Sequence, residues 1–272
     1  MANEKVKQAA EMLEKGVAEI IDSGRLTEWL DVMSRFHRYS ARNTILIWIQ
    51  NPEATHVAGY KAWKQKFNRQ VRKGEKAISI LAPIKHKSVI RETDKLTGEV
   101  TDHEHIWLSF KTVPVFDISQ TDGDELPTIT TDLAGNVEGF GELCEKVESA
   151  TTATVVYGCE FADPECHGSY NRLENAIRIA EGMSEAQTFK TLVHEIAHSL
   201  LHCQDNEHRN DSKELREVQA EGVAYIVCHA LGIDAGDYSF GYIAGWGEDT
   251  KAILNELSTI QQTASAILDK VA

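Results

Sequence analysis

The segment His194-Glu195-Ile196-Ala197-His198 is the feature that most limits what this chain can fold into. Its two histidines are four residues apart, so a helix places them on one face. Apolar residues fill most other positions from Leu192 to Leu201, which predicts that this helix is buried. A buried polar side chain needs a partner, and a bound metal ion supplies one. The pattern therefore predicts a zinc site that uses His194 and His198.

A third ligand is expected on the next helical segment, near residues 213–232. A catalytic zinc has three protein ligands and one open position, and a carboxylate is a suitable third ligand. Glu217 and Glu221 are four residues apart on that segment and share a face. Periodicity does not choose between them, and an exposed, solvated face remains an alternative for both.

The two helices together resemble those of the gluzincin metallopeptidases, in which a Glu-x-x-x-Glu or Glu-x-x-x-Asp pair follows the histidine motif. This resemblance implies that Glu217 is the third zinc ligand and that Glu221 accepts a hydrogen bond from a ligand histidine. It implies that Glu195 is the catalytic base that acts on water, and that the substrate is a peptide or protein. Tyr170, Tyr225 and His167 are the candidates for an oxyanion donor, whereas His202 and His208 are expected at the surface.

The periodicity along the chain predicts an α+β protein with two domains, residues 1–125 and 126–272. The resemblance to the gluzincins implies a zincin-like fold for the second domain. In the first domain we expect helices over residues 6–21 and 27–49, and strands over 77–84 and 106–116 with a hairpin tip at Thr97-Gly98-Glu99. Residues 117–135 have the composition of a linker. Beyond them we expect helices near 136–150, 184–203, 213–232 and 248–271, and strands near 153–157, 168–172 and 175–180.

Charge is divided unequally between the two halves. Residues 1–125 contain 19 Lys and Arg against 18 Asp and Glu, whereas residues 126–272 contain 9 against 24. Within the first half, residues 35–91 contain 13 basic side chains and two acidic ones, with aromatic residues between them. Basic groups beside aromatic rings are typical of surfaces that bind single-stranded DNA, although the aromatic residues also suit a core. The candidates for DNA contact are Arg38, Arg42, Tyr60, Lys61, Trp63, Lys64, Arg69, Arg72, Lys73 and Lys76.

Three segments of this basic region, residues 39–47, 50–63 and 70–83, resemble the N-terminal single-stranded-DNA-binding domain of ArdC-type antirestriction proteins. Those proteins and the related LtrC-like proteins of mobile elements also carry a C-terminal zincin domain, in the order expected here. The resemblance implies a mobile-element protein that binds single-stranded DNA and protects incoming DNA from restriction.

A second hypothesis is a non-catalytic DNA-protecting or restriction-blocking protein with a structural or vestigial zinc site. The acidic C-terminal half favours it, because such a charge can imitate DNA. Glu195 argues against it, because a structural zinc has no need of a base. The sequence has no apolar stretch that suits a membrane span or a signal peptide, and its five cysteines form no C-x-x-C pair, so we expect a cytoplasmic protein with reduced thiols.

Overall fold

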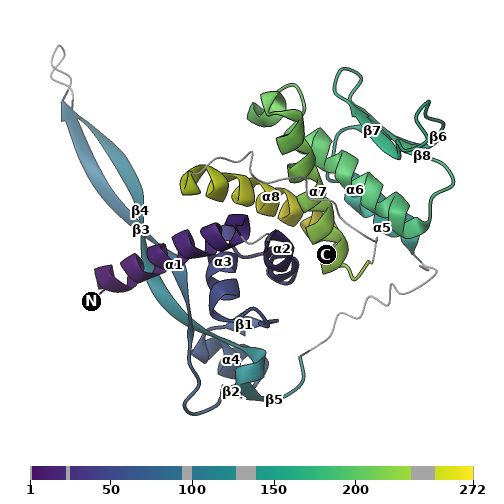
Figure 1. Cartoon of the computed structure of the whole chain (residues 1–272). Helices are drawn as coiled ribbons and strands as arrows, with labels where there is room; N and C mark the ends of the chain where they lie inside the picture. Colours follow the sequence, from purple (N-terminus) through teal and green to yellow (C-terminus); the bar gives the residue numbers. More distant parts are fainter. Residues whose placement is uncertain (1, 23–24, 94–99, 127–138, 234–248, 272) are drawn as a thin grey trace.

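The structure is a computed structural model that describes residues 2–22, 25–93, 100–126, 139–233 and 249–271 (Figure 1). It is an α+β fold with two domains, as predicted. The N-terminal domain contains α1 (Ala2–Asp22), α2 (Leu26–Arg35), α3 (Ala41–Gln50), β1 (Val57–Ala58), α4 (Tyr60–Phe67), β2 (Arg69–Val71), β3 (Ile78–Thr93), β4 (Val100–Asp117), the short 3-10 helix η1 (Ile118–Gln120) and β5 (Thr121–Gly123).

A long hairpin of β3 and β4 dominates the N-terminal domain. The two strands are antiparallel from the pair Ile78 and Val115 to the pair Thr93 and Val100, and β1 adds a short third strand beside β4. The base of the hairpin packs against α1 and α3, and its far end extends away from the helices (Figure 1). Both predicted strands are confirmed and are longer than expected, while the predicted tip lies outside the described residues.

The helix predicted over residues 27–49 is wrong in one respect, because it is two helices. Between α2 and α3 the chain turns at residues 36–40, and Ser40 takes an extended conformation and caps α3 through the backbone N–H of Asn43. Apolar periodicity continues across this turn because Phe36 and Tyr39 still face the core, where their rings meet edge to face. Periodicity alone therefore did not reveal the break.

The C-terminal domain places a small sheet beside a set of helices. Its sheet has the order β6-β8-β7, in which β7 and β8 form the predicted antiparallel hairpin and β6 runs parallel to β8. Asn171 shapes the hairpin turn, since its side chain accepts hydrogen bonds from the backbone N–H groups of Leu173 and Glu174. The elements are α5 (Phe140–Glu148), β6 (Thr154–Cys159), β7 (Gly168–Asn171), β8 (Ala176–Ala180), α6 (Glu185–Leu201), η2 (Glu207–Asn210), α7 (Lys213–Ala230) and α8 (Thr250–Val271).

The two domains share one continuous hydrophobic core. Helix α7 packs on α2, and α8 packs on α1 and α3 as well as on α5, α6 and α7. Polar contacts cross the same boundary, since Tyr225 donates to Asp31 over 2.5 Å and Gln261 donates to the backbone oxygen of His37 over 2.7 Å. None of the described helices is long and apolar enough to cross a membrane.

The expected linker begins later than predicted, because residues 117–123 belong to the N-terminal domain. Asp117 is 1% exposed, and β5 pairs with β2. The carboxylate of Asp117 accepts hydrogen bonds from the backbone N–H groups of Thr55, His56 and Ser119 over 2.8, 3.0 and 2.9 Å. The polar composition of this segment suggested a loop, but its polar side chains Asp117 and Thr121 are buried and hydrogen-bonded. Residues 127–138 lie outside the described part of the chain, and the boundary near residue 125 stays a prediction.

Replacing Asp117 by Ala should lower the free energy of unfolding by about 2–3 kcal/mol at neutral pH, because buried N–H groups lose their acceptor. Burial raises the pKa of Asp117, but the hydrogen bonds from Ser119, Thr55 and His56 outweigh it, so the pKa lies below its ordinary value. The stabilisation is therefore present above about pH 3.9 and is lost as the pH falls through the folded-state pKa. Urea unfolding from pH 7 down to pH 3 should show the difference between the two proteins narrowing. Asp122→Ala, at an exposed position, is the control and should change the midpoint little; equal losses in both variants would contradict the assignment.

Candidate metal centre

A stripe of polar side chains runs along one face of α6. Lys190, His194, His198 and His202 follow one another at intervals of four residues, so a helix places them in one row. Ser184 caps the helix by accepting a hydrogen bond from the backbone N–H of Gln187. The other faces of α6 are buried against β7, β8, α5 and α8. The polar row consequently has to find its partners on α7.

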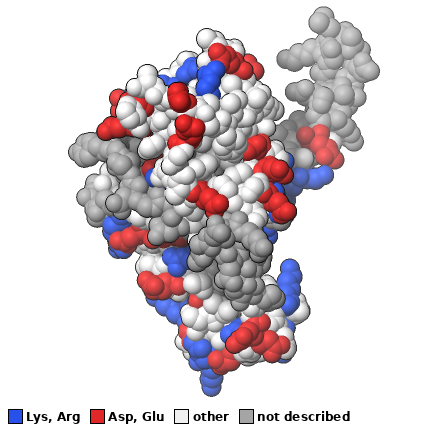
Figure 2. Space-filling view, turned by 90° about the vertical axis from the view of Figure 1, so that its right-hand side faces the viewer, with Lys and Arg blue, Asp and Glu red and all other residues white. Residues whose placement is uncertain are grey.

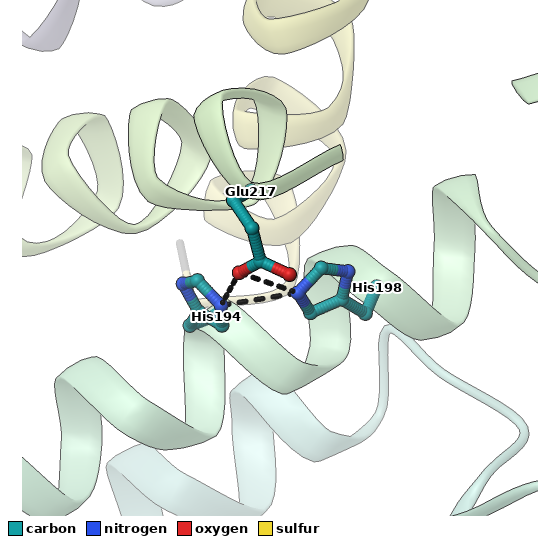
Figure 3. Close-up of side chains that lie close together, drawn as sticks. All are labelled: His194, His198 and Glu217. Carbon is teal, nitrogen blue, oxygen red and sulfur yellow. Dashed lines mark hydrogen bonds and ion pairs between the residues drawn. The ribbon is translucent and has the colours of Figure 1, made fainter. Parts of the chain in front are cut away.

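Helix α7 supplies those partners. Glu217 extends from α7 toward the point between His194 and His198 (Figure 3). Its Oε2 lies 3.4 Å from His194 Nε2 and 3.6 Å from His198 Nε2, and the two Nε2 atoms are 3.1 Å apart. One turn further along, Glu221 contacts His194 Nδ1 over 3.2 Å and Lys190 Nζ over 3.1 Å. The structure thus brings together all four predicted site residues of this group.

The three facing atoms have the geometry of a metal site. Ligands about 2.0–2.1 Å from a tetrahedral zinc ion are about 3.3 Å apart. The three observed separations bracket that value. Two imidazoles and one carboxylate are also a common donor set for a catalytic divalent metal, with one position left for a substrate or water. The residues therefore fit a metal ion.

The electrostatic field at this point favours a cation. Burial lowers the pKa of His194, but hydrogen bonds to Glu217 and Glu221 raise it overall to about 9. Hydrogen bonds to His194 and His198 hold the pKa of Glu217 well below its ordinary value. The site therefore stabilises positive charge between the two helices, as a metal centre requires.

Glu195 lies beside this triangle and is 6% exposed. Burial raises its pKa, although His198 and His194 oppose the rise. A backbone hydrogen bond from Tyr170 on β7 reaches its carboxylate. Glu195 and the triangle of His194, His198 and Glu217 line a pocket of about 500 Å³. Residues 165–170 also line this pocket.

The close contact between β7 and Glu195 depends on Gly168. A Cβ atom at this position would lie 2.6 Å from Cγ2 of Thr191 and 3.1 Å from Oε1 of Glu195. Any larger residue would push on the wall that holds the carboxylate. The strand and the helix can approach only because this side chain is missing.

Only some of the other predicted residues lie at the site. Tyr170 and His167 line the pocket, and the hydroxyl of Tyr170 donates to Asn175. Tyr225 is wrong as an oxyanion donor, because its hydroxyl is engaged by Asp31 at the contact between α7 and α2. His202 is wrong as a surface residue, because it is 2% exposed. His208 is partly buried and contacts Asp211.

The sequence analysis missed Lys190, His202 and Gln219 as parts of the site. His202 Nδ1 lies 2.8 Å from His198 Nδ1, and its Nε2 lies 2.8 Å from Oε1 of Gln219. Burial lowers the pKa of His202 to about 4, so the ring is neutral at neutral pH. The four-residue spacing on α6 was a signal for Lys190 and His202, but only the packing of α7 identified Gln219.

The predicted DNA-contacting residues fall into two groups. Exposed side chains are those of Arg38, Arg42, Tyr60, Lys61, Lys64, Arg72, Lys73 and Lys76. Trp63 is wrong as a stacking residue, because it is 1% exposed and donates its indole N–H to the backbone oxygen of Phe116. Arg69 binds Thr121 and backbone oxygens of β5, whereas Arg72 is exposed and forms surface ion pairs with Glu75 and Asp122.

Aromatic side chains outside the candidates are also exposed, among them Phe67 on α4 and Trp107 and Phe110 on β4. Trp107 on β4 is 43% exposed, and its ring stacks on those of His86 and His105.

In the face seen in Figure 2, Lys and Arg side chains occur mainly in the lower part, where α4, β2 and β5 lie, with acidic groups among them. Acidic side chains are spread over the rest of that face. On this face the basic side chains therefore gather over one part of the N-terminal domain.

The fold and the site define an HExxH metallopeptidase-like domain joined to a helical domain with a long β-hairpin. Residues 2–116 match the family described as the N-terminal domain of anti-restriction factor ArdC, and residues 159–228 match the IrrE N-terminal-like domain of the M78 peptidase family. The chain thus carries an ArdC-type N-terminal domain followed by an M78 peptidase-like domain.

Whole proteins also match this chain, over more residues than either family match covers. The chain is 27% identical over 289 residues to an uncharacterized protein of Bacillus anthracis, with 90% of this chain and 47% of that protein covered. It therefore spans about half the length of that curated relative. The crystal structure of the Mn(II)-bound antirestriction protein ArdC from the R388 plasmid matches with a TM-score of 0.58 and 21% identity, over 97% of this chain and 98% of the other. Its metal-free structure matches with a TM-score of 0.50 and 24% identity, over 85% of each chain. At these identities the likeness shows the fold.

Replacing Gly168 by Ala should lower the free energy of unfolding by about 1–3 kcal/mol, because the added methyl group overpacks the contact with Thr191 and Glu195. Gly141 on α5 has open space around it, so Gly141→Ala is the matched control and should be neutral or stabilising by up to about 1 kcal/mol. Thermal unfolding of both variants measures the difference. A Gly168→Ala protein as stable as the wild type would show that β7 does not press on Glu195.

Proposed function

We propose that this protein is a metal-dependent peptidase whose N-terminal domain binds single-stranded DNA. The observation that carries the proposal is the triangle of His194 Nε2, His198 Nε2 and Glu217 Oε2, with the buried Glu195 beside it. Glu217 acts as the third ligand, and Glu221 orients His194 by accepting from its Nδ1–H. Zinc is the metal we expect, because this donor set binds zinc more tightly than manganese.

The residues divide the chemistry of peptide hydrolysis between them. A divalent metal supplies Lewis acidity, which polarises the substrate carbonyl and makes water more acidic. Glu195 takes the proton from the attacking water and passes it to the leaving nitrogen. Strand β7 is an edge strand of its sheet in the described structure and lines the pocket, so it offers main-chain groups that align an extended peptide.

The biological role we propose is protection of incoming DNA from restriction, the role for which the matching ArdC domain family and the R388 plasmid protein are named. A second candidate is a non-catalytic protein that blocks restriction by binding. The 24 acidic against 9 basic side chains in residues 126–272 favour this candidate. The two candidates differ in whether Glu195 is needed, so one variant separates them.

Glu195→Gln should retain one equivalent of zinc and should lose hydrolysis of a casein substrate by a factor of at least about 100, because the amide cannot accept a proton. Metal content after dialysis and substrate cleavage are measured together. His198→Ala is the comparison and should lose both metal and activity, since two ligands remain. If Glu195→Gln cleaves as fast as the wild type, Glu195 has no part in catalysis. If it is inactive as a peptidase yet still protects plasmid DNA in a restricting host, the binding role replaces the catalytic one.

Binding to single-stranded DNA should depend on the exposed lysines of α4 and of the turn that follows β2. Changing Lys61, Lys64 and Lys73 together to Glu should weaken binding at least about tenfold and lower the slope of log affinity against log salt by about 2. Fluorescence anisotropy of a labelled oligonucleotide with the full chain across a salt series measures both values. The matched control changes the exposed Lys213, Lys251 and Lys270 of the C-terminal domain to Glu. Equal losses in the two triple variants would reject this surface as the binding site.

A further inference from the structure

A chain of hydrogen bonds begins behind His198, on the side away from the ligand triangle. His198 Nδ1 lies 2.8 Å from His202 Nδ1, and His202 Nε2 lies 2.8 Å from Oε1 of Gln219. The amide nitrogen of Gln219 then donates to Asp211 Oδ2 over 3.1 Å and to Glu256 Oε2 over 2.7 Å. His202 and Gln219 are 2% and 0% exposed, so these bonds are shielded from water.

The two carboxylates at the end of the chain set the orientation of Gln219. Ionised carboxylates only accept hydrogen bonds, so the amide NH2 group has to point toward Asp211 and Glu256. The amide oxygen therefore points toward His202 and requires a donor there. His202 consequently carries its proton on Nε2, and its Nδ1 is an acceptor.

The tautomer of His202 in turn fixes the tautomer of His198, a proposed metal ligand. Because His202 Nδ1 is an acceptor, the contact of 2.8 Å with His198 needs a proton on His198 Nδ1. A neutral His198 then has its free electron pair on Nε2, the atom that faces Glu217 and His194. A histidine with the opposite tautomer would present an N–H to the metal and could not bind it.

We propose that His202 and Gln219 are positioning residues that hold His198 in its metal-binding tautomer. Glu221 does the same for His194 under the proposed function, so each ligand histidine has its own partner. The partner of His198 is a histidine and not a carboxylate, so it adds no negative charge beside the metal centre. The inference rests on the metal centre proposed above.

Histidine tautomers can be measured directly by long-range ¹H–¹⁵N NMR of the full chain with ¹⁵N-labelled histidine. We expect His202 to be protonated on Nε2 and His198 on Nδ1 in the wild-type protein, with assignments made by loss of signals in single variants. This readout holds with or without bound metal. His202 protonated on Nδ1 would overturn the proposal whatever the variants do.

Zinc affinity, measured by competition with a chromophoric chelator, gives the second readout. His202→Leu should bind zinc 10–100 times more weakly, whereas the similarly shaped His202→Asn should lose less than about threefold, because its side-chain oxygen can accept from His198 Nδ1. Ser199→Ala is the control, since Ser199 is equally buried on α6 but bonds to Thr151 and the backbone oxygen of Ile196.

The outcomes separate this proposal from the proposed function. Equal zinc affinity in wild type, His202→Leu and His202→Asn would overturn the positioning role. Equal weakening in His202→Leu and Ser199→Ala would also overturn it, because general loss of packing would then explain the result. A wild-type protein that binds neither zinc nor manganese would contradict the metal centre itself, while the NMR experiment would still decide the tautomers.

Discussion

The structure depends on a partly buried row of polar contacts between α6 and α7, two helices that also bury many apolar side chains. Lys190, His194, His198 and His202 form a row on α6, and leaving such groups buried without partners would cost several kcal/mol. Glu217, Gln219 and Glu221 on α7 meet that row. Each partner meets a different part of the row. Glu221 meets the lysine and the first histidine, Glu217 meets the two proposed ligands, and Gln219 meets the last histidine. The same pairing therefore holds the helices together and creates the concentrated donor set that a metal ion fits.

Helix α7 also connects this centre to the N-terminal domain. Its first half carries Glu217, Gln219 and Glu221, whereas its second half packs on α2 and carries Tyr225 and His229, both of which contact Asp31. Helix α8 packs against α7 and against α1 and α3. The N-terminal domain is consequently part of the packing that positions the third proposed ligand. The two domains thus share one hydrophobic core. The position of α7 depends on packing against the N-terminal domain as well as against α6 and α8.

Charge in the sequence proved to be a poor guide to which basic groups are available for DNA. Arg69 and Arg72 belong to the basic segment, yet they are engaged with β5, η1 and neighbouring acids. Trp63 lies among the basic residues and is buried, whereas Trp107 lies outside the candidates and is exposed. An arginine can serve either a phosphate or a backbone carbonyl, and composition does not distinguish them. The lysines of α4 are exposed and no described ion pair engages them, so they are the part of the basic segment tested first.

The sequence by itself determined the features that depend on local spacing. The helix with His194 and His198, the hairpin of β7 and β8 and the two-domain order followed from periodicity, turn residues and resemblance, because neighbours along the chain decide them. Periodicity left the roles of Glu217 and Glu221 open and the resemblance only implied them. The tertiary structure decided which face of α7 meets α6, so that Glu217 lies between the histidines and Glu221 reaches behind His194. It also decided that His202 and Asp117 are buried, that Tyr225 faces the other domain and that α2 and α3 are separate. These outcomes depend on contacts between residues far apart in the chain, and periodicity within one segment carries no information about its partner.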